Sequence, residues 1–138
     1  MKKFYLKSLI LCILCSGCCN KTQQENLYNI DIAEQKCISK VDSTDLINQC
    51  SLKAIDAWYE EINKYLILLK SLSTSENYLN IQKSQQEWEK YRDAEFLVIN
   101  SIIEKQGTMY QNTIIALKKE IIKNRAIELK RLYDVLKF

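Results

Sequence analysis

The sequence predicts an all-α fold, an antiparallel bundle of three long helices with a short N-terminal helical segment stapled by one disulfide. The chain has 138 residues with no Pro and only two Gly, so it offers few residues that punctuate strands and turns. Apolar residues recur at steps of three and four over long stretches, as they do on one face of a helix. The only Ser/Thr-rich break between these stretches lies at residues 71–75, and short connections make neighbouring helices antiparallel.

Residues 1–17 have the features of a signal peptide that ends in a lipobox. A basic start precedes an apolar run over residues 8–14, which is too short for a permanent membrane span. The following Cys-Ser-Gly-Cys run resembles a bacterial lipobox, so we expect Cys18 to be acylated and to become the mature N-terminus. Residues 18–29 would then be the lipidated Cys and a polar tether, and the domain at residues 30–138 would face the periplasm or the cell exterior. The alternative is an ordinary secretory signal that merely contains cysteines.

Composition limits the functional classes. The chain has no His, which removes the commonest general base and the commonest transition-metal ligand. The net charge of +3 depends on Lys2, Lys3 and Lys7 of the signal, because without them the 20 basic residues become 17, equal to the 17 acidic ones. A neutral mature chain gives no support to nucleic-acid binding. We expect no cofactor, no metal and no enzymatic activity.

The first elements of the domain contain its cysteine pair. Residues 27–41 are weakly helical, and a cluster of Asp, Ser and Thr at residues 42–45 should cap the next helix, which runs to about residue 71. Of the six Cys, two leave with the signal, Cys18 takes lipid, and Cys19 has no obvious partner. Cys37 and Cys50 remain, and in an oxidising compartment they should form a disulfide. The expected stripe of the first segment is Ile30, Ala33, Cys37 and Val41, and the expected face of the next helix is Ile47, Cys50, Ala54, Trp58, Ile62, Tyr65 and Leu69.

The two remaining helices carry polar residues where aliphatic ones are expected. Ser75 can cap the third helix, and Gly107 lies where a helix C-cap glycine belongs. On the third helix the face is Ile81, Gln85, Trp88, Arg92, Phe96, Ile99 and Ile103. On the fourth it is Tyr110, Ile114, Leu117, Ile121, Arg125, Leu129, Leu132 and Leu136. Gln85, Arg92 and Arg125 need partners if these faces are buried, because an unpaired buried polar group costs about 1–3 kcal/mol.

These motifs together resemble the LprI-like lysozyme-inhibitor family. The most specific part is the Gln-x-x-Trp-x-x-Tyr-Arg-Asp-Ala block, and the whole resemblance covers roughly residues 37–133. The family often has a Cys where this chain has Phe96 and another near Leu117, and their joint absence leaves Cys37 and Cys50 as a single bridge. The resemblance implies an exported or lipid-anchored helical protein and, for some members, inhibition of c-type lysozyme. Its motif residues, structural or binding, are Asn63, Tyr65, Gln85, Trp88, Tyr91, Arg92, Asp93 and Arg125.

Several of these residues permit two interpretations. Arg92 and Arg125 could recognise an anionic partner or form internal ion pairs, and Trp58, Trp88 and Tyr91 could stack on a glycan or belong to the core. The acids at residues 60–61 and at residues 87 and 89 could form a glycosidase pair, a patch facing a basic protein, or ordinary solvated faces.

We predict a lipid-anchored protein that blocks c-type lysozyme by occupying its cleft, with no nucleic-acid partner. The loops at residues 71–75 and 105–108 are candidates for insertion, because they carry hydroxyls and little bulk. The alternative is a structural or adaptor lipoprotein that binds another envelope protein.

Overall fold

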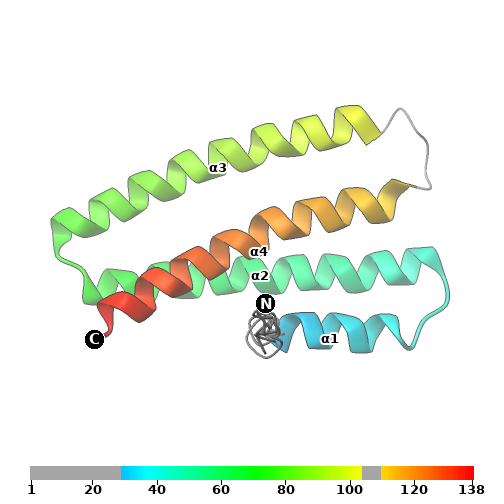
Figure 1. The fold of residues 1–138 in the computed structure, drawn as a ribbon, viewed down its shortest axis with the longest axis horizontal. Helices are drawn as coiled ribbons and strands as arrows, with labels where there is room; N and C mark the ends of the chain where they lie inside the picture. The colour runs from blue at the N-terminus through cyan, green and yellow to red at the C-terminus, as the bar shows by residue number, and fades with distance from the viewer. Residues whose placement is uncertain (1–28, 104–109) are drawn as a thin grey trace, which may run out of the picture.

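The computed structural model describes residues 29–103 and 110–138, without the side chains of Ile102 and Ile103, and these residues form an all-helical bundle. The elements are α1 (Asn29–Ile38), α2 (Thr44–Leu72), α3 (Ser75–Ile103) and α4 (Gln111–Leu136). In Figure 1, α2 and α4 run in one direction, and α1 and α3 run in the other. The predicted fold class is confirmed. The lipobox with Cys18, Gly107 and the loop at residues 105–108 lie outside the described residues.

Helix α2 forms as its sequence predicts. Ser43, within the predicted capping cluster, is the N-cap, and its hydroxyl accepts a hydrogen bond of 3.3 Å from the backbone N–H of Leu46. The helix ends at Leu72, and the N–H of the C-cap residue Ser73 donates to the carbonyl of Leu69. The predicted face is buried except for Ile47, which is half-buried; the buried residues are Cys50, Ala54, Trp58, Ile62, Tyr65 and Leu69.

The core lies between α2 and α4. Trp58, Ile62 and Leu69 of α2 pack with Ile122 and Leu129 of α4, and the ring centroids of Tyr65 and Tyr133 lie 5.8 Å apart. The predicted face of α4 is only partly correct, since Leu117, Leu132 and Leu136 are exposed. The residues that α4 buries are Ile114, Ile122, Arg125, Ala126 and Leu129.

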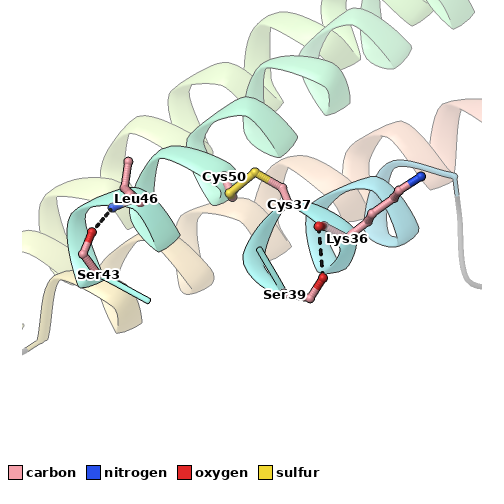
Figure 2. Close-up of a disulfide and its surroundings, with 6 residues drawn as sticks. All are labelled: Lys36, Cys37, Ser39, Ser43, Leu46 and Cys50. Carbon is pink, nitrogen blue, oxygen red and sulfur yellow. Dashed lines mark hydrogen bonds between the residues drawn. A yellow bond between two sulfur atoms is a disulfide. The ribbon is translucent and has the colours of Figure 1, made fainter. Parts of the chain in front are cut away.

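Helix α1 is held by a disulfide and by two ion pairs. The predicted Cys37–Cys50 bridge is present, with 5.8 Å between the two Cα atoms, and it joins α1 to α2 (Figure 2). The predicted apolar stripe is wrong for Ala33, which is exposed.

The buried residues of α1 are acidic. The carboxylate of Glu34 lies 2.6 Å from the ammonium of Lys119, and that of Asp31 lies 3.0 Å from Lys123. Helix α1 therefore contacts α4 through two ion pairs and is joined to α2 by the disulfide.

Helix α3 is the most weakly packed of the long helices. It begins with a cap one residue earlier than predicted, because the Thr74 hydroxyl accepts from the N–H of Asn77 at 3.3 Å. Figure 1 shows α3 at the top of the bundle, with α4 between it and α2 for much of its length. Its most buried side chains are Gln85 and Ile99, while Ile81, Trp88, Arg92 and Phe96 are half-buried. A polar residue therefore lies at the centre of the contact between α3 and α4.

Candidate functional site

Four motif residues from α3 and α4 form one cluster around the Trp88 indole. The guanidinium carbons of Arg92 and Arg125 lie 5.3 and 5.8 Å from the centre of the indole, within the range of cation–π attraction. Arg125 is only 9% exposed, and its Nε donates a 3.0 Å hydrogen bond to the amide oxygen of Gln85. The Gln85 amide nitrogen in turn donates to Glu89 at 3.1 Å. Gln85 and Arg125 therefore satisfy each other inside the bundle.

The two arginines also have carboxylate partners on their own helices. Arg92 lies 2.8 Å from the Asp93 carboxylate, and Arg125 lies 3.3 Å from that of Glu128 and 3.4 Å from the Ser84 hydroxyl. These contacts confirm the interpretation of internal ion pairs for both arginines. Each of the three guanidinium nitrogens of Arg125 donates a hydrogen bond within the protein, and two of these bonds go to Gln85 and Ser84 of α3, so this guanidinium stabilises the α3–α4 contact.

Arg92 connects the cluster to α2 through Tyr59. Its guanidinium carbon lies 5.8 Å from the centre of the Tyr59 ring. Burial raises the pKa of the Tyr59 phenol, and the positive charge and hydrogen bonding of Arg92 partly offset that rise. Burial lowers the pKa of Arg92, but hydrogen bonding and charge from Asp93 and Tyr59 outweigh it, so the net pKa is raised. Arg92 therefore remains cationic in this contact.

The other motif residues divide between the core and the surface. Tyr65 is buried against Tyr133, as a structural residue. Tyr91 is 53% exposed, so its assignment to the core is wrong; its helical position is on the flank of α3, about 60° from Trp88. Asn63 is exposed on α2, and the Asp93 side chain is 65% exposed on α3. The motif thus builds the α3 packing with some members and leaves others on the surface.

The acids do not assemble into a catalytic pair. Glu61 lies 2.8 Å from the Lys64 ammonium and Glu87 lies 2.9 Å from that of Lys90, each one turn away on its own helix. The hydrogen bond with Lys90 lowers the pKa of Glu87, whose side chain is exposed. Among the described residues no group of His, Cys, Asp and Glu could hold a metal ion, and no helix has the length and apolarity to cross a bilayer.

Two open cavities flank the bundle. One, of about 330 Å³, lies beside the disulfide and has Ile30, Ala33, Ala54 and Ala57 in its wall. The other, also about 330 Å³, lies over Arg125 between α3 and α4, with Ser84 and Glu128 in its wall.

A row of exposed residues lies on α2 beside Tyr59. Its members follow each other at steps of three or four, so they share one face of the helix. They lie on the opposite side of α2 from the residues that pack on α4. The row consists of Leu52, Asp56, Glu60, Asn63 and Ile67, all of them exposed.

A second exposed row lies on α3 with the same helical spacing. It consists of Leu79, Gln82, Gln86, Glu89, Asp93 and Leu97, all of them exposed. Arg92 above the Tyr59 ring, and Lys70 with its ammonium 5.7 Å from the centre of the Tyr78 ring, bring α2 and α3 into contact at two points. We call the two rows together the outer face.

Sequence reasoning did not predict the outer face as a unit. It singled out Asn63, Asp93 and both pairs of acids, but it could not tell which acid of each pair lies on a common surface. The signal available in the sequence was the Leu and Ile residues at the ends of each row, because their positions do not fit the predicted core face of either helix.

Comparison with known proteins gives one family. The family model described as "Lysozyme inhibitor LprI" matches residues 36–129, which is more than half of the chain. The matched range includes both cysteines of the bridge, the Trp88 cluster and both rows of the outer face. No curated protein and no solved structure matches the chain.

Proposed function

Because the chain belongs to the LprI lysozyme-inhibitor family, we propose that it is an exported, lipid-anchored binding protein that inhibits a c-type lysozyme by covering its substrate cleft. The single observation that carries the proposal is the family match over residues 36–129, which includes the whole α2–α3 unit. Occlusion requires no chemistry from the inhibitor. It needs a rigid surface and a few anchoring side chains.

The geometry supports a binding function over a catalytic one. The acids at residues 61 and 87 pair with lysines on their own helices, and both motif arginines bind carboxylates of the chain itself. The exposed surface of the helices remains available to a partner, and the Trp88 cluster packs beneath it. Rigid surfaces of this kind lose little conformational entropy on binding.

The anchor is the second part of the proposal. The lipobox-like run that ends at Cys18 supports acylation there, and mass spectrometry of the membrane-extracted protein should find lipid on Cys18 as the first residue. An unmodified chain that begins at another residue would contradict the anchor and leave the inhibitory domain as a secreted protein.

The inhibitory function is tested by cell-wall lysis. Mature protein, with folding verified by circular dichroism, should slow lysis by a c-type lysozyme at a stoichiometry near one to one. A control is an equal concentration of an unrelated protein that does not bind lysozyme. If a large excess of folded protein leaves the lysis rate unchanged, lysozyme is not the target and the envelope-adaptor function takes its place.

A further inference from the structure

We propose that the outer face of α2 and α3 is the surface that docks on the lysozyme, and that it selects a basic protein. The inference rests on the proposed function and adds the location and chemistry of the contact. It depends on three properties of the outer face: the helices that support it, its charge, and the exposed aliphatic residues at its ends.

The two rows adjoin each other where α2 and α3 contact, at Tyr59 and near the turn between the two helices. Arg92 reaches from α3 over the Tyr59 ring of α2, and Lys70 reaches from α2 over Tyr78 of α3. The charges of Asp93 and Glu89 act on the Tyr59 phenol, so these acids lie close to α2. Every member of the two rows is exposed, so α1 and α4 do not cover them.

The two rows carry four acidic residues, and exposed lysines border them: Lys70 is one step beyond Ile67 on α2, and Lys90 lies between Gln86 and Asp93 on α3. The four acidic residues are Asp56, Glu60, Glu89 and Asp93, and neither described row contains Lys or Arg. Arg92, beside the rows, offsets one of these charges by pairing with Asp93. The four acids provide a local attraction for a basic partner at this face.

The ends of the rows supply apolar anchors. Leu52, Ile67, Leu79 and Leu97 are between 47% and 71% exposed, although each has the size of a core residue. The rows are about 22 and 27 Å long by the helical rise of about 1.5 Å per residue. A standard interface buries about 800 Å² on each partner, which is a patch about 28 Å across. The face therefore has the length of a specific protein interface, with aliphatic ends and acidic residues between them.

The experiment measures the dissociation constant of the full mature chain, in a mild nonionic detergent, for a c-type lysozyme at low and moderate salt. The test variant carries Asp56→Lys and Glu60→Lys. The matched control carries Asp42→Lys and Glu120→Lys, which make the same change of net charge at exposed positions away from the outer face. A second pair compares Leu97→Ser on the face with Val135→Ser on α4, at 71% and 73% exposure.

We expect the face charge variant and Leu97→Ser each to raise the dissociation constant about tenfold or more, and both controls to change it less than about threefold. The affinity of the parent chain should fall with salt, and the face charge variant should lose most of that dependence. Circular dichroism on all variants verifies folding, which exposed substitutions should not disturb.

The outcomes separate the inference from the function beneath it. If the parent chain inhibits lysozyme and the face variants bind as tightly as it does, the docking surface is overturned while the inhibitory function stands. If the face and control charge variants weaken binding equally, net charge rather than this face attracts the enzyme, and the inference is again overturned. If the parent chain neither binds nor inhibits lysozyme, the proposed function is rejected and the inference falls with it.

Discussion

Helices α2 and α3 are both 29 residues long, yet different forces hold them in the bundle. Helix α2 buries a continuous apolar row that includes Trp58, Ile62 and Leu69, against α4. The central contact of α3 is instead a hydrogen bond between Gln85 and Arg125, with the Trp88 indole between two guanidinium groups. Equal length and equal periodicity therefore predict two helices but not the kind of contact that stabilises each of them.

The difference has a consequence for dynamics. Burial of apolar surface contributes about 25 cal/mol per Å², whereas a hydrogen bond or a cation–π contact contributes about 1 kcal/mol. Helix α3 should therefore open at a lower free energy than α2, as segments with few buried apolar contacts do. Both helices supply a row of the outer face, so the polar cluster has to keep one row beside the other.

The largest effect should come from the α2 side of the comparison. Leu69 is 0% exposed, so Leu69→Ala should lower the free energy of unfolding by about 2–5 kcal/mol through lost contacts and a cavity. Ile67, two residues away on the same helix and 70% exposed, is the matched control, and Ile67→Ala should change stability by less than about 0.5 kcal/mol. Urea unfolding followed by circular dichroism measures both. Equal effects of the two substitutions would contradict the assignment of the core to the α2–α4 contact.

The disulfide should have the next largest effect, because it attaches α1 to the stable helix. Replacing Cys37 and Cys50 by Ser should lower the free energy of unfolding by about 2–4 kcal/mol. The ion pairs of Glu34 with Lys119 and of Asp31 with Lys123 remain in that variant, so α1 should stay helical at low salt and lose its contacts as salt rises. Thiol titration verifies the parent bridge, and a parent chain in which the thiols of both Cys37 and Cys50 react would contradict it.

A smaller effect, confined to α3, should follow from loss of the buried arginine. Arg125→Ala removes the partner of the Gln85 amide oxygen and should cost about 1–3 kcal/mol. Hydrogen exchange should show faster exchange along α3 while the slowest amides of α2 keep more of their protection. The control is Arg131→Ala, at an exposed position of the same helix, which should alter neither. Uniform acceleration in α2 and α3 would mean that the two helices open together, and the comparison would fail.

The face of α2 was predictable because its apolar row has no competitor. In α4 two apolar rows lie side by side, one through Leu117 and Leu132 and one through Ile122 and Ala126. Periodicity gives both rows the same weight. Helix α2 covers the second row, and the sparse contact with α3 leaves Leu117 and Leu132 exposed, so the prediction failed where tertiary contacts decide between equivalent local patterns.

The sequence did not predict the burial of Glu34 or the exposure of Tyr91, but it did predict that the polar residues of α3 and α4 need partners. The burial of Glu34 depends on Lys119, 85 positions along the chain, and no local pattern of α1 announces that partner. The polar residues of α3 and α4 were recognisable as anomalies, and their pairing with each other and with nearby acids was the expected resolution. The interpretation of Tyr91 as a core residue failed for a local reason. A residue about 60° from the centre of a weakly covered face remains in solvent.

The smallest predicted effect concerns Tyr59, where α2 contacts α3. Burial raises the pKa of its phenol above the ordinary value of 10.0, so the folded state favours the neutral form. The resulting contribution to stability is fully present below about pH 10 and is lost as the pH rises through the raised pKa. Because the charge of Arg92 lowers the Tyr59 pKa, Arg92→Gln should raise that pKa further. Ultraviolet difference titration against Tyr59→Phe isolates this phenol from the other tyrosines. A Tyr59 pKa that stays the same or falls in Arg92→Gln would show that Arg92 does not reach α2, and the polar cluster would then hold α3 to α4 alone.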